Sequence, residues 1–339
     1  MQACYITQFG SRENIFVGPL PDPKPSEKQV LIRIKAASLN HLDIWVRMGR
    51  PGNALPFPHI LGSDCAGVVE YIGKNVSGVK VGDEVIVYPG INYKYYTSLR
   101  SSDEPYGILG LTRQGVFAEY VAVEEDMVFF KPSYLTFQEA SALPITYVTA
   151  WRMLFTKGAL QSGQTVLIHG IGGGVAQAAL ALALIAGARV IVTSSSDKKL
   201  EKARMLGAHY TLNYSKENIS EHILEITHGI GVDLVVDAVG AATMPVNIEC
   251  TRRMGKITVC GVTTGHETPI NLQAVYWKQL QIFGSTMGSQ EEFHQVLNTL
   301  SLHKAKPVID SEYPLEHVQK ATQIMEEGTQ FGKIILKTA

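Results

Sequence analysis

Short runs of alternating or continuous apolar residues, each ended by glycine or proline, fill the first third of the chain. In Val30–Ala36, apolar side chains recur at every second position, which is typical of a half-buried strand. Ala66–Gly73 and Val85–Val87 have a similar β-type composition, and glycine-rich turns separate them. We therefore predict a sheet of short strands in this region.

From about Thr165 the pattern changes to strand and helix in alternation. The predicted strands are Thr165–His169, Arg189–Thr193, Asp233–Ala238 and Lys256–Cys260, and the predicted helices include Val175–Ala186 and Asp197–Leu206. This alternation predicts a parallel, doubly wound sheet. The pattern ends near Gly284. A predicted helix (Gln290–His303), a second helix after Tyr313–Glu316 and a closing strand (Lys333–Lys337) follow.

Length and composition indicate a globular protein of two domains. A chain of 339 residues exceeds the usual size of one core, and its net charge of −1 gives no basic surface for nucleic acid or membrane. The N-terminus has no signal-peptide pattern, and the apolar run Val175–Ala188 is too short to span a bilayer. The four cysteines show no CxxC spacing, so we expect reduced thiols in the cytoplasm rather than a disulfide or cysteine-zinc framework.

A glycine-rich turn lies between the first predicted strand of the alternating region and its long helix. Glycines permit a tight turn and a close approach of backbone N–H groups to phosphate, and the helix N-terminus adds a positive dipole. Such clusters also occur as plain turns, but the strand–turn–helix context favours a dinucleotide site. The expected phosphate-binding residues are Gly170, Gly172, Gly173, Gly174 and Val175.

The motifs taken together resemble the medium-chain dehydrogenase/reductase superfamily over essentially the whole chain. They are S-L-N-H-L-D at 38–43, L-G-S-D-C-A-G-V-V at 61–69, V-G-D-E-V at 81–85, F-A-E-Y at 117–120, the glycine turn, and G-K-I-I-L at 332–336. The resemblance implies a GroES-like β-barrel-type catalytic domain (1–131 and 287–339) and a Rossmann doubly wound cofactor domain (132–286). It also implies a homodimer, formed by pairing of the strand at Gln281–Gly284.

The ligands of the superfamily's catalytic zinc are missing from this frame. Asn40, Ser63 and Ile145 stand where zinc-dependent members carry cysteine, histidine and cysteine, and Leu42 stands at the position of the proton-relay hydroxyl. Amide, hydroxyl and alkyl side chains cannot form that zinc site. At the positions of the structural-zinc cysteines the chain has Tyr93, Tyr96 and Leu99. We expect neither zinc.

The second strand of the cofactor domain ends in serine rather than in the acidic residue typical of NAD enzymes. Ser194, Ser195 and Lys199, with Tyr214 at the position of a tyrosine beside the 2′-phosphate in the quinone-oxidoreductase branch, predict NADPH, with NADH possible. The alternative is that the lysines form only a solvated helix face.

Catalysis without metal requires a hydride from the cofactor and a proton from a nearby group. Asn40 can orient the substrate or the nicotinamide, and Asp43 is taken to lie one strand period beyond His41. His41, Tyr95 and Tyr147 are candidate proton donors, although each can equally be a packing residue. The resemblance implies that Thr149 contacts the nicotinamide. The strand ends predict further cofactor contacts, which are Val239, Gly261, Val262 and Met287.

The predicted function is zinc-independent, NADPH-dependent reduction of a quinone, an enone or a similar conjugated carbonyl, with a small-molecule electron acceptor bound between the domains. Two alternatives remain open. One is a zinc alcohol dehydrogenase that uses His41, His59 and Asp64 as ligands. The other is a non-enzymatic NADPH-binding redox sensor, because fold does not fix function.

Overall fold

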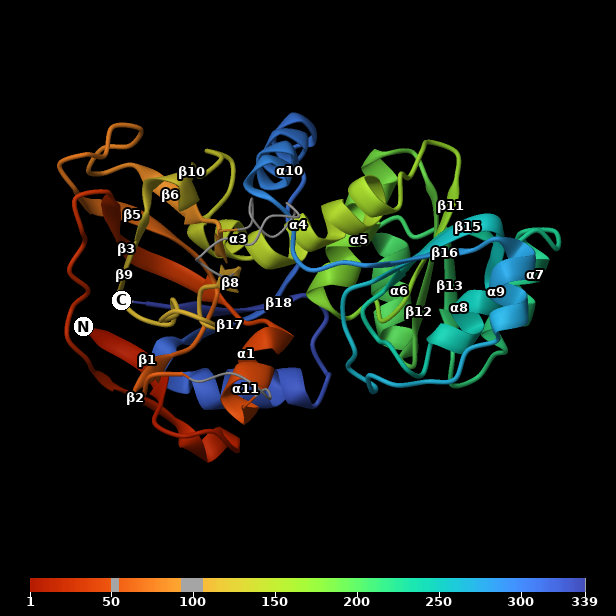
Figure 1. The fold of residues 1–339 in the computed structure, drawn as a ribbon, viewed down its shortest axis with the longest axis horizontal. Helices are drawn as coiled ribbons and strands as arrows, with labels where there is room; N and C mark the ends of the chain where they lie inside the picture. The colour runs from red at the N-terminus through yellow and green to blue at the C-terminus, as the bar shows by residue number, and fades with distance from the viewer. Residues whose placement is uncertain (50–54, 93–105, 339) are drawn as a thin grey trace. The chain divides into compact units, whose positions relative to one another are not determined.

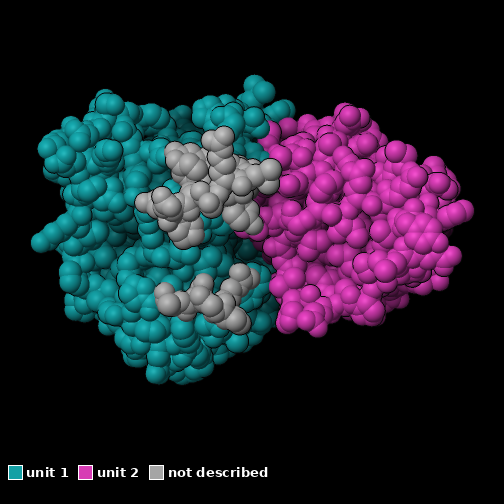
Figure 2. Space-filling view, viewed as in Figure 1, with its two compact units in different colours: residues 1–145, 289–339 teal, residues 146–288 magenta. Residues whose placement is uncertain are grey.

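The computed structural model describes residues 1–49, 55–92 and 106–338. The chain forms two compact units, unit 1 from residues 1–145 and 289–339 and unit 2 from residues 146–288 (Figure 2). The chain passes from unit 1 to unit 2 after Ile145 and returns to unit 1 after Gly288. The sequence analysis placed these two boundaries after residues 131 and 286. Tyr93, Tyr95, Tyr96 and Leu99 lie outside the described residues.

Unit 1 is built on β-sheets, as predicted. A seven-stranded sheet has the order β10-β6-β5-β3-β18-β17, with β9 paired to β3, and these strands are labelled in Figure 1. A three-stranded sheet has the order β2-β1-β4. The strands are β1 (Gln2–Ile6), β2 (Ile15–Pro19), β3 (Gln29–Ser38), β4 (His59–Ile60), β5 (Asp64–Ile72), β6 (Glu84–Val87), β7 (Gly90–Ile91), β8 (Gly107–Ile108), β9 (Tyr120–Glu124), β10 (Val128–Phe130), β17 (Ile309–Pro314) and β18 (Lys333–Lys337).

The closing strand of the chain completes this sheet beside β3. β18 pairs antiparallel with β3 in the register Ile335 to Ser38, so the last strand runs against the segment that leads to Asn40. Alternation in β3 sends Val30, Ile32 and Ile34 into the core of unit 1, where each is fully buried. The helices of this unit are α1 (His41–Met48), α3 (Phe137–Ser141), α10 (Gln290–His303) and α11 (Val318–Glu326), with single 3₁₀ turns at Arg12–Asn14, Glu125–Met127 and Leu315–His317.

Unit 2 has the predicted parallel, doubly wound sheet. Its six strands have the order β13-β12-β11-β14-β15-β16, and every neighbouring pair is parallel. The strands are β11 (Thr165–Ile168), β12 (Arg189–Ser194), β13 (Tyr210–Asn213), β14 (Val232–Asp237), β15 (Thr251–Val259) and β16 (Gln281–Gly284). The helices are α5 (Gly174–Ile185), α6 (Asp197–Met205), α7 (Ile219–Ile226), α8 (Met244–Cys250) and α9 (Leu272–Lys278).

Crossovers between parallel strands are generally right-handed, so a sheet whose order runs outward on both sides of β11 carries helices on both faces. The core on one face joins side chains of α7 and α8, such as Ile223 and Ile248, to Leu167, Val235 and Ile257 of the strands. The first strand, β11, lies near the centre of the sheet. The next strands, β12 and β13, are added on one side of it, and β14, β15 and β16 on the other, so the order of the strands reverses beside β11. In open sheets of this kind, ligands bind at the carboxyl ends of the strands next to that point.

One local prediction was wrong. His41 and Asp43 are not on a strand but in the first turn of α1. The sequence analysis also left the helix α4 (Pro144–Trp151) and the π-helical turn Arg152–Lys157 unassigned.

No helix in the described part of the chain is long and apolar enough to cross a membrane.

Candidate functional site

The segment Asn40–Asp43 forms the start of α1, and its local geometry follows from a helix cap. Asn40 has extended backbone angles as the N-cap residue, and its N–H donates to the Asp43 carboxylate at 2.7 Å. Residues two apart on a helix point in different directions. Asp43 is accordingly buried, while His41 on the next face is half-buried. The two side chains therefore do not act from one face, contrary to the strand interpretation.

The Asn40 side chain is held from both ends of its amide. Its Nδ2 donates to Asp64 at 2.9 Å, and its Oδ1 accepts from Lys333 Nζ at 2.7 Å. Lys333 also donates to the Leu39 carbonyl at 2.8 Å and lies 3.4 Å from the Asp64 carboxylate. These contacts join the start of α1, the start of β5 and the closing strand β18 into one buried cluster. They leave the amide a single orientation.

Burial dominates the titration of this cluster. Burial raises the pKa of Asp43 to about 7. The hydrogen bond from the Asn40 N–H and the positive charge of Lys333 both act in the opposite direction and lower this pKa. Burial also raises the pKa of Asp64 and lowers that of Lys333, while their mutual attraction opposes both shifts. Asp64 accepts hydrogen bonds from Asn40, Lys333 and the Ile145 N–H, and these three donors favour its ionised form against the effect of burial. With a pKa of about 7, Asp43 is the carboxyl group that gains or loses its proton near neutral pH.

Ser63 and Ile145, at the other two zinc-ligand positions, also form hydrogen bonds within the protein. Ser63 donates its hydroxyl proton to the Leu109 carbonyl at 2.7 Å. Ile145 contributes a backbone N–H, which donates to Asp64 at 3.0 Å, and an apolar side chain. Amide, hydroxyl and alkyl groups bonded in this way do not form a zinc donor set. The residues at these positions therefore do not fit the metal.

The alternative ligands His41, His59 and Asp64 do not converge on a metal site. His59 is fully buried, and its Nε2 lies 2.9 Å from the Gly110 carbonyl. Asp64 is engaged by Asn40, Lys333 and Ile145, as described. In residues 1–49, 55–92 and 106–338 no group of three or more histidine, cysteine or acidic side chains could hold a metal ion.

The candidate proton donors have different surroundings. His41 packs edge-on against Trp45, with ring centroids 6.0 Å apart, and burial lowers its pKa against the attraction of Glu326. Tyr147 is buried on α4. Tyr95 is outside the described residues. Of His41 and Tyr147, it is His41 that combines partial exposure with proximity to Asn40 in the chain.

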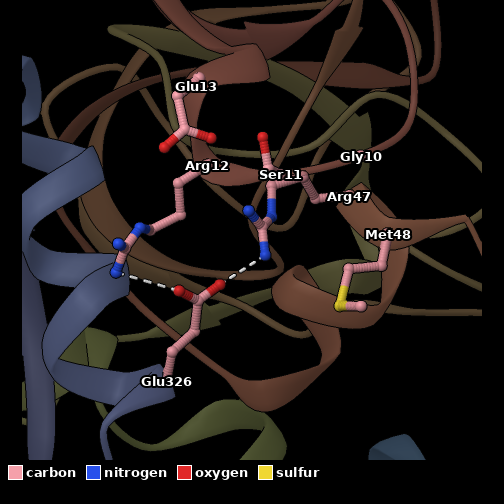
Figure 3. Close-up of a pocket in the computed structure, with 7 residues that line it drawn as sticks. All are labelled: Gly10, Ser11, Arg12, Glu13, Arg47, Met48 and Glu326. Atoms are coloured by element: carbon pink, nitrogen blue, oxygen red, sulfur yellow. Dashed lines mark hydrogen bonds and ion pairs between the residues drawn. The ribbon is translucent and has the colours of Figure 1, made fainter.

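A cavity of about 480 Å³ lies elsewhere in unit 1, at the ends of α1 and α11 (Figure 3). In it Glu326 lies between two arginines, 3.1 Å from Arg12 and also paired with Arg47, and dashed lines mark both ion pairs (Figure 3). Neither Asn40 nor Asp64 lines this cavity. The arginine charges are used internally, so this cavity is not the expected substrate site.

The glycine turn of unit 2 has the geometry that a bound phosphate requires. Gly170 adopts a φ of +67°, a conformation that favours glycine, and Gly173 caps α5 without any side-chain capping bond. A Cβ atom on Gly173 would meet only the Gly170 carbonyl, at 3.5 Å. The first N–H groups of α5, from Gly174 and Val175, have no carbonyl partner within the helix. Together with Gly172, which is buried in the turn, these residues fit the pyrophosphate of a dinucleotide.

The end of β12 carries hydroxyls and no unpaired acidic group. Ser194 is buried and accepts from the Ser196 N–H at 3.1 Å, while Ser195 is exposed and Lys199 half-buried on α6. The Tyr214 N–H donates to the Ser194 carbonyl at 3.2 Å, and its ring is 55 % exposed. The structure thus brings the backbones of Ser194 and Tyr214 together.

The carboxylate of Asp197, at the start of α6, is already paired. Asp197 accepts from Asn213 at 2.6 Å and from Lys216 at 2.5 Å. These two hydrogen bonds lower the pKa of Asp197. Its charge is therefore offset, and it does not oppose an anionic group beside Ser194 and Ser195.

Three of the remaining predicted cofactor contacts, Val239, Gly261 and Val262, lie in two loops that pack together. The other two, Thr149 and Met287, lie outside these loops. A Cβ on Gly170 would lie 3.4 Å from Val239 Cγ2, and a Cβ on Gly261 would lie 2.6 Å from the Ala238 carbonyl. The loops after β14 and β15, which contain Val239, Gly261 and Val262, therefore meet beside the glycine turn. Thr149 is buried on α4, and Met287 is buried with a φ of +45°.

Comparison with known proteins agrees with this architecture. Residues 26–133 match the model of the alcohol dehydrogenase GroES-like domain, and residues 174–301 match that of the zinc-binding dehydrogenases. The chain is 34 % identical to a zinc-type alcohol dehydrogenase-like protein of Schizosaccharomyces pombe, with 91 % of this chain and 90 % of that one covered. The chain belongs to the medium-chain dehydrogenase/reductase superfamily. It is therefore an oxidoreductase of a nicotinamide-dependent family, as the resemblance implied.

Among the relatives of this chain, some are named quinone oxidoreductases and others alcohol dehydrogenases. Human quinone oxidoreductase is 29 % identical, with 99 % of this chain and 97 % of that one covered. The NAD-dependent alcohol dehydrogenase of Sulfurisphaera tokodaii is 30 % identical, with 99 % of each covered. A crystal structure of an NAD-dependent alcohol dehydrogenase superposes with a TM-score of 0.95 at 38 % identity over the full length of both chains. The superfamily is thereby fixed, and the substrate within it is not.

Sequence reasoning missed the role of Lys333. The signal was present, because a lysine stands in the otherwise apolar closing strand Lys333–Leu336, where its side chain is buried. A lysine is almost never fully buried unless it is paired. That rule demanded a carboxylate partner, but the sequence did not indicate which one.

Proposed function

We propose that this protein is a zinc-independent, NADPH-dependent reductase of quinones or of other conjugated carbonyl compounds. The observation that carries the proposal is the state of Asn40. Where a zinc enzyme presents a metal ligand, this chain presents an amide whose two ends are bonded to Asp64 and Lys333. Reduction of an electron-poor acceptor by hydride does not require a metal to polarise the carbonyl, provided that hydrogen-bond donors replace it.

Asn40 is the proposed donor to the acceptor's carbonyl oxygen. An amide nitrogen carries two protons, and one of them goes to Asp64. We assign the other proton to the acceptor's carbonyl oxygen, and Lys333 fixes the opposite end of the amide. NADPH, once bound, supplies the hydride at C4 of its nicotinamide. His41 is the proposed route for the proton, with Asp43 and Tyr147 in positioning roles.

The cofactor preference rests on the end of β12. Ser194 and Ser195 stand where an acidic side chain would repel a 2′-phosphate, and Tyr214 lies beside them. Lys199 on α6 offers a positive charge. Thr149, Val239, Gly261, Val262 and Met287 are the proposed contacts for the remainder of the dinucleotide.

We also propose a homodimer. β16 is the last strand of the six-stranded sheet, so one of its edges has no partner strand in the described chain. Ile282 on this strand is 40 % exposed, and on the preceding helix α9 the large side chains Tyr276 and Trp277 are 65 % and 68 % exposed. An open edge next to exposed aromatic groups favours pairing with a second copy.

The test is NADPH consumption by purified, metal-analysed protein with 1,2-naphthoquinone, 9,10-phenanthrenequinone and 2-alkenals, with NADH in parallel. We expect turnover without stoichiometric zinc and a lower KM for NADPH. Tight NADPH binding without turnover of any acceptor would instead support the redox sensor. Stoichiometric zinc together with alcohol oxidation would support the zinc dehydrogenase.

A further inference from the structure

A chain of hydrogen-bonded polar side chains crosses the buried interior of unit 2 at the carboxyl ends of three parallel strands. His169 directly follows β11, Thr193 lies near the end of β12, Asp237 ends β14, and Asn247 lies on α8. Each of the four is at most 4 % exposed. The site described above makes no use of them, although the surrounding strand residues are apolar.

The bonds of this chain fix the tautomer of the histidine. Asp237, as a carboxylate, can only accept, so Asn247 points its Nδ2 at it, at 2.5 Å. Asn247 Oδ1 then faces His169 Nε2 at 2.7 Å and must accept from it. His169 Nδ1, 3.0 Å from Thr193 Oγ1, is left to accept the hydroxyl proton. Burial lowers the pKa of His169, which favours the neutral imidazole with its proton on Nε2.

Each end of this series of hydrogen-bonded side chains is bonded to a loop of the proposed cofactor site. Asp237 also accepts from the N–H groups of Val239 and Gly240, at 2.6 and 3.1 Å. At the other end, the Thr193 carbonyl accepts from the Ile171 N–H at 3.0 Å, inside the glycine turn. His169 itself immediately precedes Gly170. Hydrogen bonds are directional, so a fully bonded chain fixes the relative position of its ends more sharply than apolar packing does.

We propose that His169 is a positioning residue of the dinucleotide site: through Thr193 on one side and Asn247–Asp237 on the other, it holds the glycine turn and the Val239–Gly240 loop at the separation that the cofactor requires. The inference rests on the proposed function in taking NADPH as the ligand of this turn. His169 does not touch the cofactor; it acts through the backbone of residues 170–171 and 239–240.

The decisive variant is Thr193→Val, which keeps the side-chain shape and removes only the proton that His169 accepts. Its matched control is Thr258→Val on β15, since Thr258 is equally buried and donates to the Val235 carbonyl at 2.9 Å, outside the chain of four. NADPH dissociation constants and melting temperatures would be measured for both. We expect both variants to lose similar thermal stability, while Thr193→Val alone weakens NADPH binding, by about tenfold. Equal NADPH affinity in the two variants would overturn the inference.

A second pair of variants and a spectroscopic measurement test the histidine directly. His169→Gln can still donate toward Asn247, so it should bind NADPH more tightly than His169→Leu, which cannot. Nitrogen-15 NMR of the wild-type imidazole at pH 7 should show one protonated nitrogen, Nε2; a charged ring or an Nδ1–H tautomer would contradict the proposal without involving the cofactor. Failure of the wild type itself to bind NADPH would overturn the proposed function together with the inference, whereas equal binding by all variants would overturn the inference alone.

Discussion

The amide oxygen of Asn40 lies 2.7 Å from the ammonium group of Lys333, a residue 293 positions later in the chain. The same ammonium group lies 3.4 Å from Asp64, which also accepts from the other end of the Asn40 amide. A single buried cation thus connects the beginning of α1, the beginning of β5 and the closing strand. The orientation of the proposed substrate donor depends on it.

Replacing Lys333 with Met should destabilise unit 1 strongly, because it leaves the buried Asp64 carboxylate without its cation. Removing one partner of a buried ion pair costs about 3–5 kcal/mol. Urea unfolding of Lys333→Met would measure the loss. The matched control is Lys337→Met on the same strand, whose partner Glu312 and own side chain are 39 % and 48 % exposed. That control should change the free energy of unfolding by less than about 1 kcal/mol.

The double variant Lys333→Met with Asp64→Asn separates charge from packing. Asn at position 64 removes the uncompensated charge, so we expect it to recover part of the stability that Lys333→Met loses. If the double variant were no more stable than Lys333→Met alone, the loss would come from packing and not from the ion pair.

The protonation of Asp43 should make the stability depend on pH between about 4 and 7. Burial raises the pKa of Asp43 to about 7 in the folded protein, far above its ordinary value. The folded state therefore retains a proton that the unfolded chain releases, and the free energy of unfolding falls as pH rises through this window, by up to about 1.4 kcal/mol per pH unit. Asp64, whose pKa is also raised, contributes in the same direction.

Asp43→Asn tests this assignment, because the amide oxygen of Asn can still accept from the Asn40 N–H while the titrating proton is gone. Unfolding free energies at pH 5, 6 and 7.5 should decrease in the wild type and decrease less in the variant. Identical slopes for the two proteins would show that Asp43 does not titrate in this range.

Lys199→Glu should raise the KM for NADPH much more than the KM for NADH, because the new carboxylate repels only the cofactor with a 2′-phosphate. Steady-state kinetics with both cofactors would measure the ratio. Lys202→Glu, on the exposed side of α6, is the control for a general effect of charge and should leave the ratio unchanged. Equal effects of Lys199→Glu on both cofactors would count against the NADPH assignment.

The sequence predicted the sheet of unit 2 better than it predicted the chemistry of unit 1. Parallel strands buried on both sides, such as Val232–Asp237, carry their signal in consecutive residues. The Asn40–Asp64–Lys333 cluster carries only one such signal, the lysine in an apolar strand, because its members meet through the pairing of β3 with both β5 and β18. His41 and Asp43 were expected one strand period apart, two residues from each other in the sequence. The cap formed by Asn40 and Asp43 starts a helix there instead.

Removal of metal should leave activity unchanged. The groups at the zinc-ligand positions bond to the protein itself, Ser63 to the Leu109 carbonyl and Asn40 to Asp64 and Lys333, so they offer no tetrahedral set of donors. Prolonged dialysis against EDTA, followed by metal analysis and NADPH-dependent quinone reduction, would test this. Loss of turnover that added zinc restores would contradict it.

Ile282→Lys should convert the proposed homodimer to a monomer. Ile282 lies on the edge strand β16 and is 40 % exposed in the isolated chain, and a lysine there would place a charge in the paired edge. Light scattering should give twice the chain mass of 37.1 kDa for the wild type and that mass itself for the variant. Leu302→Lys is the control, because Leu302 is an 80 % exposed apolar residue on α10 of unit 1, outside the six-stranded sheet. A dimeric Ile282→Lys protein would show that the association uses another surface, and a monomeric wild type would show that the open edge of β16 stays unpaired in solution.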